Sequence, residues 1–160
     1  MLKRLLFIIL FVLGFSDLVS AQQSSEELQV QKVIETFFEG FHARDSVVMK
    51  SVLSDAVVVQ TIGKTKSGEV ELHQEDIHKV LKGIVSIPSK TTFQEVLHDY
   101  KVRIDGAMAN AWTPYSLYIN EGFSHCGVNN FQLLKQNEEW KIIYLIDTRR
   151  KEGCEDIAKK

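Results

Sequence analysis

Histidine and tyrosine side chains recur in the second half of the chain, in segments whose alternation of polar and apolar residues is typical of β-strands. His98 and His125 could transfer a proton near neutral pH, and Tyr100 and Tyr115 could orient or polarise a carbonyl group. A catalytic base also needs an orienting partner, and we expect no carboxylate on the same sheet face. The pattern therefore indicates a pocket and leaves the catalytic residues unassigned.

The same predicted face carries groups that suit binding. Asn129 could read donor and acceptor positions on a ring, and Arg150 could donate two parallel hydrogen bonds to an anionic or heterocyclic ligand. Phe38 and Phe41 could stack against that ring. The predicted ligand-binding set comprises His98, Tyr100, Thr113, Tyr115, His125, Asn129, Tyr144, Thr148, Arg150, Phe38 and Phe41.

These side chains also have a plainer structural interpretation. Phenylalanines at helical spacing usually pack in a core. Arg150 and its neighbour Arg149 could pair with Asp147 or Glu152 at a solvated strand end, and the two histidines could be exposed at the sheet rim. An enzyme would be favoured if Asp147 or Asp99 reached a pocket histidine.

Three turns set the strand register on which the set depends. Asp105-Gly106 predicts a two-residue hairpin that pairs Tyr100 with Ala111. A three-residue turn over 120–122 keeps the odd-numbered residues of its two strands on one face, and a polar turn over 136–139 joins the last two strands. A slip of one residue would move a whole strand's side chains to the other face.

Two strands are expected to run without interruption. One face of the strand after Thr92 carries Val96, His98, Tyr100, Val102 and Ile104. One face of the final strand carries Trp140, Ile142, Tyr144, Ile146, Thr148 and Arg150.

Helices precede these strands. Ser24 and Glu27 resemble a capping box. The stripe that follows, at helical spacing, comprises Val30, Val33, Ile34, Phe37, Phe38 and Phe41. Asp45 is expected to cap a short second helix, and apolar residues over 77–84 predict a third. Helices followed by antiparallel strands indicate an α+β fold.

This order of elements, with F-F-E-G-F-H-A-R-D ending the first helix and W-K-I-I in the last strand, resembles the nuclear transport factor 2-like (cystatin-like cone) superfamily. The segments H-C-G-V-N-N-F-Q-L-L and I-D-T-R-R-K-E-G-C are similar to its bacterial lumazine-binding-like branch. The resemblance implies N-terminal helices packed in the concave face of a strongly bent antiparallel sheet. It also implies a conical pocket for a small, aromatic or heterocyclic molecule.

Two kinds of enzyme in that superfamily offer alternatives. In ketosteroid isomerase-like members, the essential tyrosine and carboxylate positions correspond here to Phe37 and Thr61, which can supply neither an oxyanion donor nor a base. That activity is set aside. A lyase or isomerase that uses pocket histidines and tyrosines, as in dehydratase-like members, stays open.

The outer sheet face is expected to carry Met108, Trp112, Val128, Leu134, Ile143 and Leu145. Many relatives in the superfamily pair through this face, and that much apolar surface needs cover, so we expect a homodimer. A non-catalytic dimeric interaction domain is a third alternative.

Residues 1–21 are typical of a signal peptide. Lys3 and Arg4 precede the apolar run Leu5–Phe15, and Val19-Ser20-Ala21 offers small residues for cleavage. The run is shorter than the roughly 18–20 residues that a membrane span needs. We therefore expect an exported protein, periplasmic or secreted, whose residues 22–160 form one domain outside the membrane.

The remaining composition limits the partners. Removing Lys3, Arg4 and Asp17 from the 19 basic and 21 acidic residues leaves 17 and 20, and no basic stripe predicts a nucleic-acid surface. No metal-binding or cofactor motif is present in the sequence.

Cys126 and Cys154 are the only cysteines, and in an oxidising compartment they are expected to form a disulfide. The register places Cys126 opposite Arg149, and a turn at Gly153 would bring Cys154 back. A metal site and a reactive thiol are the alternatives.

Overall fold

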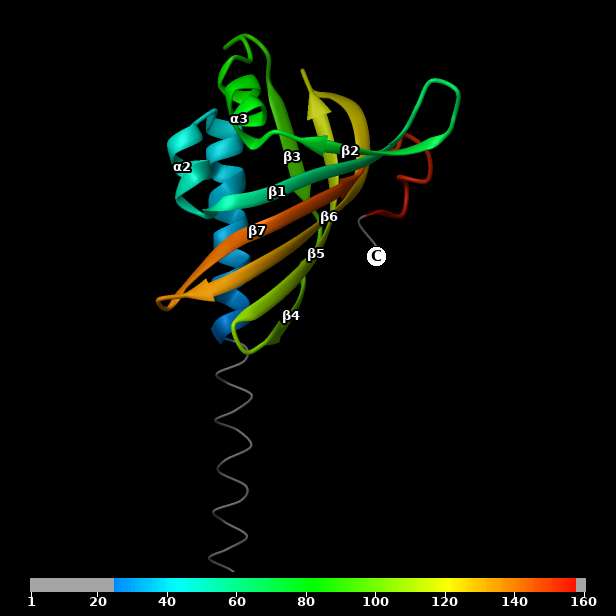
Figure 1. The fold of residues 1–160 in the computed structure, drawn as a ribbon. Coiled ribbons are helices and arrows are strands. Elements are labelled where there is room, and N and C mark those ends of the chain that lie inside the picture. The colour runs from blue at the N-terminus through cyan, green and yellow to red at the C-terminus, as the bar shows by residue number, and fades with distance from the viewer. Residues whose placement is uncertain (1–24, 158–160) are drawn as a thin grey trace, which may run out of the picture.

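The computed structural model describes residues 25–157. The predicted signal peptide and Ser24 lie outside the described residues. A helix over residues 25–43, here called the N-terminal helix, is followed by α2 and then by the first strands (Figure 1). The later elements are α2 Ser46–Ser51, β1 Leu53–Lys64, β2 Val70–Glu75, α3 Ile77–Val85, β3 Phe93–Leu97, β4 Lys101–Asp105, β5 Met108–Ile119, β6 Gly122–Gln136 and β7 Glu139–Thr148.

The strands form one bent sheet in the order β2-β1-β7-β6-β5-β3, with β4 also paired to β5 (Figure 1). All neighbouring strands are antiparallel except β1 and β7, which run parallel, so the α+β fold is confirmed with a mixed sheet. The parallel pair brings the first and last strands of the domain together. This pairing places Thr61 beside Asp147.

The N-terminal helix covers one face of the sheet, here called the inner face (Figure 1). Its predicted stripe is confirmed, because Val30, Ile34, Phe37 and Phe38 are all buried in the core. From the sheet, the core receives Ala109, Ala111, Phe131, Leu133, Trp140 and Ile142. Burial of these side chains, at about 25 cal/mol per Å² of apolar surface, holds the helix on the sheet.

The end of the N-terminal helix is packed closely against α2. A Cβ atom on Gly40 would lie 2.8 Å from the backbone nitrogen of Met49, so only glycine fits there. Asp45 caps α2 as predicted, since its carboxylate accepts hydrogen bonds from the backbone N–H groups of Val47 (2.8 Å) and Val48 (3.1 Å). This corner directs the chain into β1.

The strand after Thr92 is interrupted, contrary to expectation. Leu97 pairs with Tyr115, whereas Lys101 pairs with Trp112, and residues 98–100 lie in neither β3 nor β4. The pairing of β4 with β5 is therefore shifted by one residue relative to the pairing of β3 with β5. Because of this shift, the inward-facing residues change from odd-numbered to even-numbered between β3 and β4. Odd-numbered residues of β3, including Glu95, face inward, whereas in β4 the even-numbered residues do.

The final strand is also irregular. Leu133 pairs with Ile142, but Gln132 pairs with Tyr144, so Ile143 is an extra residue in β7. Trp140 and Ile142 are buried in the core as predicted. Beyond Ile143 the inner face belongs to the odd-numbered residues, so the expected continuous face from 140 to 150 is wrong.

The turns differ in detail from the predicted ones. The first hairpin turns at Gly106-Ala107, with Asp105 paired to Met108, so Tyr100 is not opposite Ala111. A two-residue turn at Asn120-Glu121 is followed by a register shift between Leu117 and Tyr118. The two deviations compensate, and the predicted register of the main part of β5 and β6 is confirmed.

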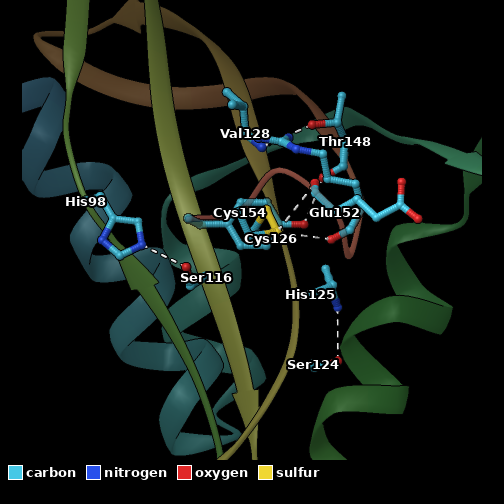
Figure 2. The surroundings of a disulfide bond; sticks show 11 residues. His98, Ser116, Ser124, His125, Cys126, Val128, Thr148, Glu152 and Cys154 are labelled. Atoms are coloured by element: carbon cyan, nitrogen blue, oxygen red, sulfur yellow. Dashed lines mark hydrogen bonds between the residues drawn. A yellow bond between two sulfur atoms is a disulfide. The ribbon is translucent and has the colours of Figure 1, made fainter. Parts of the chain in front are cut away.

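Cys126 and Cys154 form a disulfide with Cα atoms 5.9 Å apart (Figure 2). Cys126 bridges to Arg150 rather than to Arg149, a one-residue correction that follows from the extra residue in β7. The disulfide holds the segment after β7, in which Ile157 is buried. No helix within residues 25–157 is long and apolar enough to cross a membrane.

Candidate functional site

A cavity of about 340 Å³ lies between the inner face, the N-terminal helix and α3. Its apolar walls are Phe37, Phe38, Phe41, Val59, Val80, Ile84, Leu117 and Leu145. Its polar lining is Glu75, Glu95, Tyr115, His125, Asn129, Asp147 and Arg149. Apolar walls with a few convergent polar groups are typical of small-molecule sites.

Asp147 is the centre of a hydrogen-bond network. Its Oδ1 accepts a 2.6 Å bond from the Thr61 hydroxyl, and its Oδ2 accepts a 2.7 Å bond from Arg149 Nε. Arg149 Nη2 also donates to the Thr61 hydroxyl oxygen over 3.1 Å, so that hydroxyl both donates and accepts. The Arg149 guanidinium therefore balances the negative charge of Asp147, and Thr61 on β1 fixes the orientation of the carboxylate.

Tyr115 approaches the same carboxylate from β5. Its hydroxyl lies 3.2 Å from Asp147 Oδ2 and 3.0 Å from the Thr148 carbonyl oxygen, both of which can accept its single proton. Burial and the nearby Asp147 charge raise the pKa of Tyr115 well above its ordinary value, so the phenol stays neutral.

Gly127 allows this approach. A Cβ atom there would lie 1.7 Å from the Thr148 carbonyl oxygen and 2.9 Å from the Tyr115 ring. No other residue fits at this point of β6, which lies between β5 and β7. The residue opposite Tyr115 is therefore a glycine.

Glu95 reaches the cavity from β3. Its Oε1 accepts a 2.7 Å hydrogen bond from Asn129 Nδ2, and its backbone N–H donates to His42 Nε2 over 3.0 Å. Burial, and secondarily the Asp147 charge, raise the pKa of Glu95 to about 7, although Asn129 and Arg149 oppose the shift. Near neutral pH this carboxyl can therefore either donate or accept a proton.

His125 lies edge-on to Tyr115, with ring centroids 5.8 Å apart, and its Nδ1 is 3.1 Å from the Ser124 hydroxyl (Figure 2). Burial first, and then the Arg149 charge, lower the pKa of His125. The imidazole is thus neutral at physiological pH.

The cavity brings together part of the predicted ligand-binding set. The members that line it are Phe38, Phe41, Tyr115, His125 and Asn129. These positions depend on the helical stripe and on the β5–β6 register, both of which were predicted. Their role in binding stays a prediction.

The remaining predicted members from β5 and from the break between β3 and β4 do not line the cavity. His98 is bonded to Ser116 over 2.9 Å and lies apart from His125 (Figure 2). Tyr100 packs against the core, and Thr113 is fully buried, with its hydroxyl donating to the Asn129 carbonyl. The break at residues 98–100 explains why the His98 side chain does not reach the cavity.

The predicted members from the end of β7 are also misplaced. Tyr144 donates to the side-chain oxygen of Gln60, and the Thr148 hydroxyl accepts a 3.1 Å bond from the Val128 N–H. Arg150 exchanges backbone hydrogen bonds with Cys126. All three follow the extra residue Ile143, which turns the even-numbered side chains away from the cavity.

The same two irregularities supply the groups that the sequence did not predict. Glu95, Asp147 and Arg149 replace the residues that turn away, and Leu145, expected on the outer face, lines the cavity instead. Alternation in L-I-D-T-R places Leu145, Asp147 and Arg149 on one face, but nothing in the sequence marks the bulge that turns this face inward.

The two carboxylates considered as partners for a histidine behave differently. Asp147 lines the same cavity as His125 but bonds to Thr61, Tyr115 and Arg149. Asp99 accepts a 2.8 Å hydrogen bond from the backbone N–H of its neighbour Tyr100. Within residues 25–157, no group of three or more His, Cys, Asp or Glu residues could hold a metal ion.

Comparison with solved structures supports the fold. No protein-family model and no curated protein matches the chain. An NTF2-like protein of unknown function from Shewanella baltica is 18% identical with a TM-score of 0.58, over 79% of this chain and 95% of that one. A cystatin-like protein of unknown function from Nostoc punctiforme is 10% identical with a TM-score of 0.60, over 78% and 91% of the two chains.

A proposed dehydratase of the NTF2-like family from Streptomyces avermitilis is 17% identical with a TM-score of 0.61, over 80% of this chain and 98% of that one. At these identities the likeness extends to the fold. The chain therefore has the cystatin-like fold of NTF2-like proteins.

Proposed function

We propose that the protein binds a small, ring-containing molecule in the cavity beneath the N-terminal helix. The observation that carries the proposal is the lining itself. Phe38 and Phe41 contribute aromatic surface from the N-terminal helix, and the cluster around Asp147 contributes polar groups from the sheet. A cavity of about 340 Å³ has the size of common ligand sites.

Binding is favoured over catalysis by the way in which Asp147 is held. Its two oxygens accept bonds from Thr61, Tyr115 and Arg149, so the carboxylate acts as a fixed part of the wall. No described residue joins it to His125 as a base–carboxylate pair would require.

A proton-transfer enzyme of lyase or isomerase type is the second candidate, and Glu95 favours it. A carboxyl group with a pKa of about 7 that lines a cavity can exchange a proton with a ligand at neutral pH. The similar fold of the Streptomyces avermitilis protein, a proposed dehydratase, is in keeping with this candidate. Turnover that Glu95→Gln abolishes, with ligand affinity retained, would favour the enzyme.

Export as residues 22–160 and assembly as a homodimer belong to the same proposal. The disulfide supports an oxidising compartment. Exposed Met108, Trp112 and Leu134 on the outer face support pairing through the sheet. The intact mass of protein recovered from the exported fraction would show whether cleavage follows Ala21.

The test of binding is native mass spectrometry of the protein purified from its own compartment. We expect a small-molecule adduct that is lost on denaturation. Leu117→Trp, which fills the cavity, should remove the adduct, whereas Leu72→Trp, on the exposed strand β2, should retain it. Circular dichroism must show both variants folded. Bare wild-type protein that also binds nothing in a ligand screen would contradict the proposal.

A further inference from the structure

The charges that line the cavity are unequal. Glu75, Glu95 and Asp147 supply three carboxyl groups, and Arg149 supplies the one guanidinium among the described lining residues. Arg149 Nε is bonded to Asp147 at 2.7 Å, so these two charges offset each other. Glu75 and Glu95 are left to set the sign of the remaining charge, which is negative whenever either is ionised.

Glu95 has unused hydrogen-bonding capacity. Asn129 occupies Oε1, and Oε2 takes part in no hydrogen bond with any residue between 25 and 157. Protein atoms surround the group closely, which disfavours its charged form. A cation placed beside Oε2 would reverse that preference and gain a charge-assisted hydrogen bond.

The aromatic part of the cavity lining also suits a cation attached to a ring. Phe38 and Phe41 present aromatic rings, which attract positive charge over their faces and stack with other rings at their edges. For an anionic ligand, Arg149 is the one guanidinium among the described lining residues. Its Nε and Nη2 already donate hydrogen bonds to Asp147 and Thr61. The expected anion donor, Arg150, does not line the cavity.

We infer that the cavity selects ring-containing molecules that carry a protonated amine, with the amine beside Glu95 and the ring against Phe38 and Phe41. The inference rests on the proposed binding function and adds the charge class of the ligand. An ammonium group has three donors, so it can bond Glu95 Oε2 and leave donors for water or for the side-chain oxygen of Asn129.

Three probes with the same ring test the charge class: tryptamine, which is a cation; tryptophol, which is neutral; and indole-3-acetate, which is an anion. Each is titrated into the full exported protein at pH 7.5, with binding followed by NMR shifts of the cavity residues Leu117 and Leu145. We expect tryptamine to bind about tenfold more tightly than tryptophol, the equivalent of one charge-assisted contact, and indole-3-acetate to bind most weakly.

Two matched variants locate the effect. Glu95→Gln should reduce the preference for tryptamine over tryptophol to about threefold or less, with tryptophol affinity unchanged. Glu71→Gln removes a carboxylate from exposed β2, outside the cavity lining, and should leave the preference intact.

The outcomes separate the two proposals. Equal or tighter binding of tryptophol or indole-3-acetate, with shifts at Leu117 and Leu145, would overturn the charge class and leave cavity binding standing. A tryptamine preference that survives Glu95→Gln would also overturn it. If none of the probes shifts the cavity residues, the result counts against the binding function and against the inference with it.

Discussion

The Thr61 hydroxyl donates a 2.6 Å hydrogen bond to Asp147 Oδ1, although the two residues are 86 positions apart. They meet because β1 and β7 are parallel neighbours in which Thr61 is paired directly with Asp147. The contact joins the first strand of the sheet to the last at the edge of the cavity, and it fixes the carboxylate to which Tyr115 and Arg149 are also bonded.

Asp147→Asn should destabilise the protein. The amide retains the shape but removes the charge that balances Arg149, and its NH₂ group faces donors. Because Arg149 is half-exposed, we expect the free energy of unfolding to fall by about 1–3 kcal/mol rather than by the larger cost of a fully buried pair. Urea denaturation measures the change, and Asp55→Asn on the exposed part of β1 is the control. Equal stability of both variants would contradict the network.

Glu95 should make stability depend on pH. Its pKa rises from an ordinary value near 4.5 to about 7 on folding, so the folded state binds more protons between these values. This contribution is fully present below about pH 4.5 and is lost as the pH rises through 7. Glu95→Gln, which cannot ionise, should therefore gain about 1–3 kcal/mol relative to wild type between pH 5 and pH 8. A constant difference across that range would refute the assignment.

His42 should also make stability depend on pH, but in the opposite direction to Glu95. Burial lowers its pKa, and its Nε2 can accept the Glu95 N–H only while the ring is neutral. The folded state then binds fewer protons, so stability is present above the ordinary pKa of 6.5 and is lost as the pH falls through the lowered value.

Chemical denaturation between pH 5 and 7 tests this dependence. His42→Gln should flatten the part of the curve that belongs to His42, whereas His78→Gln, on the exposed start of α3, should not. The Glu95 amide should also lose protection against hydrogen exchange in wild type on acidification, when its rate is compared with the intrinsic rate at each pH. An unchanged protection factor would argue against the His42 contact.

Removing the disulfide should loosen the segment after β7. Cys126 and Cys154 are 28 positions apart, and closing a loop of this size typically contributes about 2–4 kcal/mol. The double variant Cys126→Ala/Cys154→Ala should lower the melting temperature accordingly. A reductant should lower that of wild type and leave the double variant unchanged. Equal melting temperatures for oxidised wild type and the double variant would show that the bond adds nothing to stability.

The outer face should mediate dimerisation. Met108, Trp112 and Leu134 are 57%, 44% and 39% exposed, and Met108 pairs directly with Leu134 across β5 and β6. We expect light scattering to show twice the chain mass at micromolar concentration. Trp112→Glu should give monomers, whereas Val47→Glu, on the exposed side of α2, should not. A wild-type monomer would exclude this interface at that concentration.

Local signals in the sequence determined much of the scaffold. The helical stripe that ends in Phe37, Phe38 and Phe41 predicts which face of the N-terminal helix is buried, because period and burial are directly linked. Asp45 marks a helix start for an equally local reason. Alternation and a three-residue turn also predict the register of the main part of β5 and β6, which places Tyr115, His125 and Asn129 at the cavity. The actual turn has two residues, and the register shift beside it compensates for the difference.

Only the tertiary structure decided which charged groups enter the site. The break at residues 98–100 and the extra residue Ile143 each reverse the faces of a strand, and neither has a local signature because it is the packing of the whole sheet that selects it. Those two changes turn Glu95, Asp147 and Arg149 inward and turn His98, Thr148 and Arg150 away. The pairing of Thr61 with Asp147 depends likewise on a contact between opposite ends of the domain, which strand alternation within either segment does not encode.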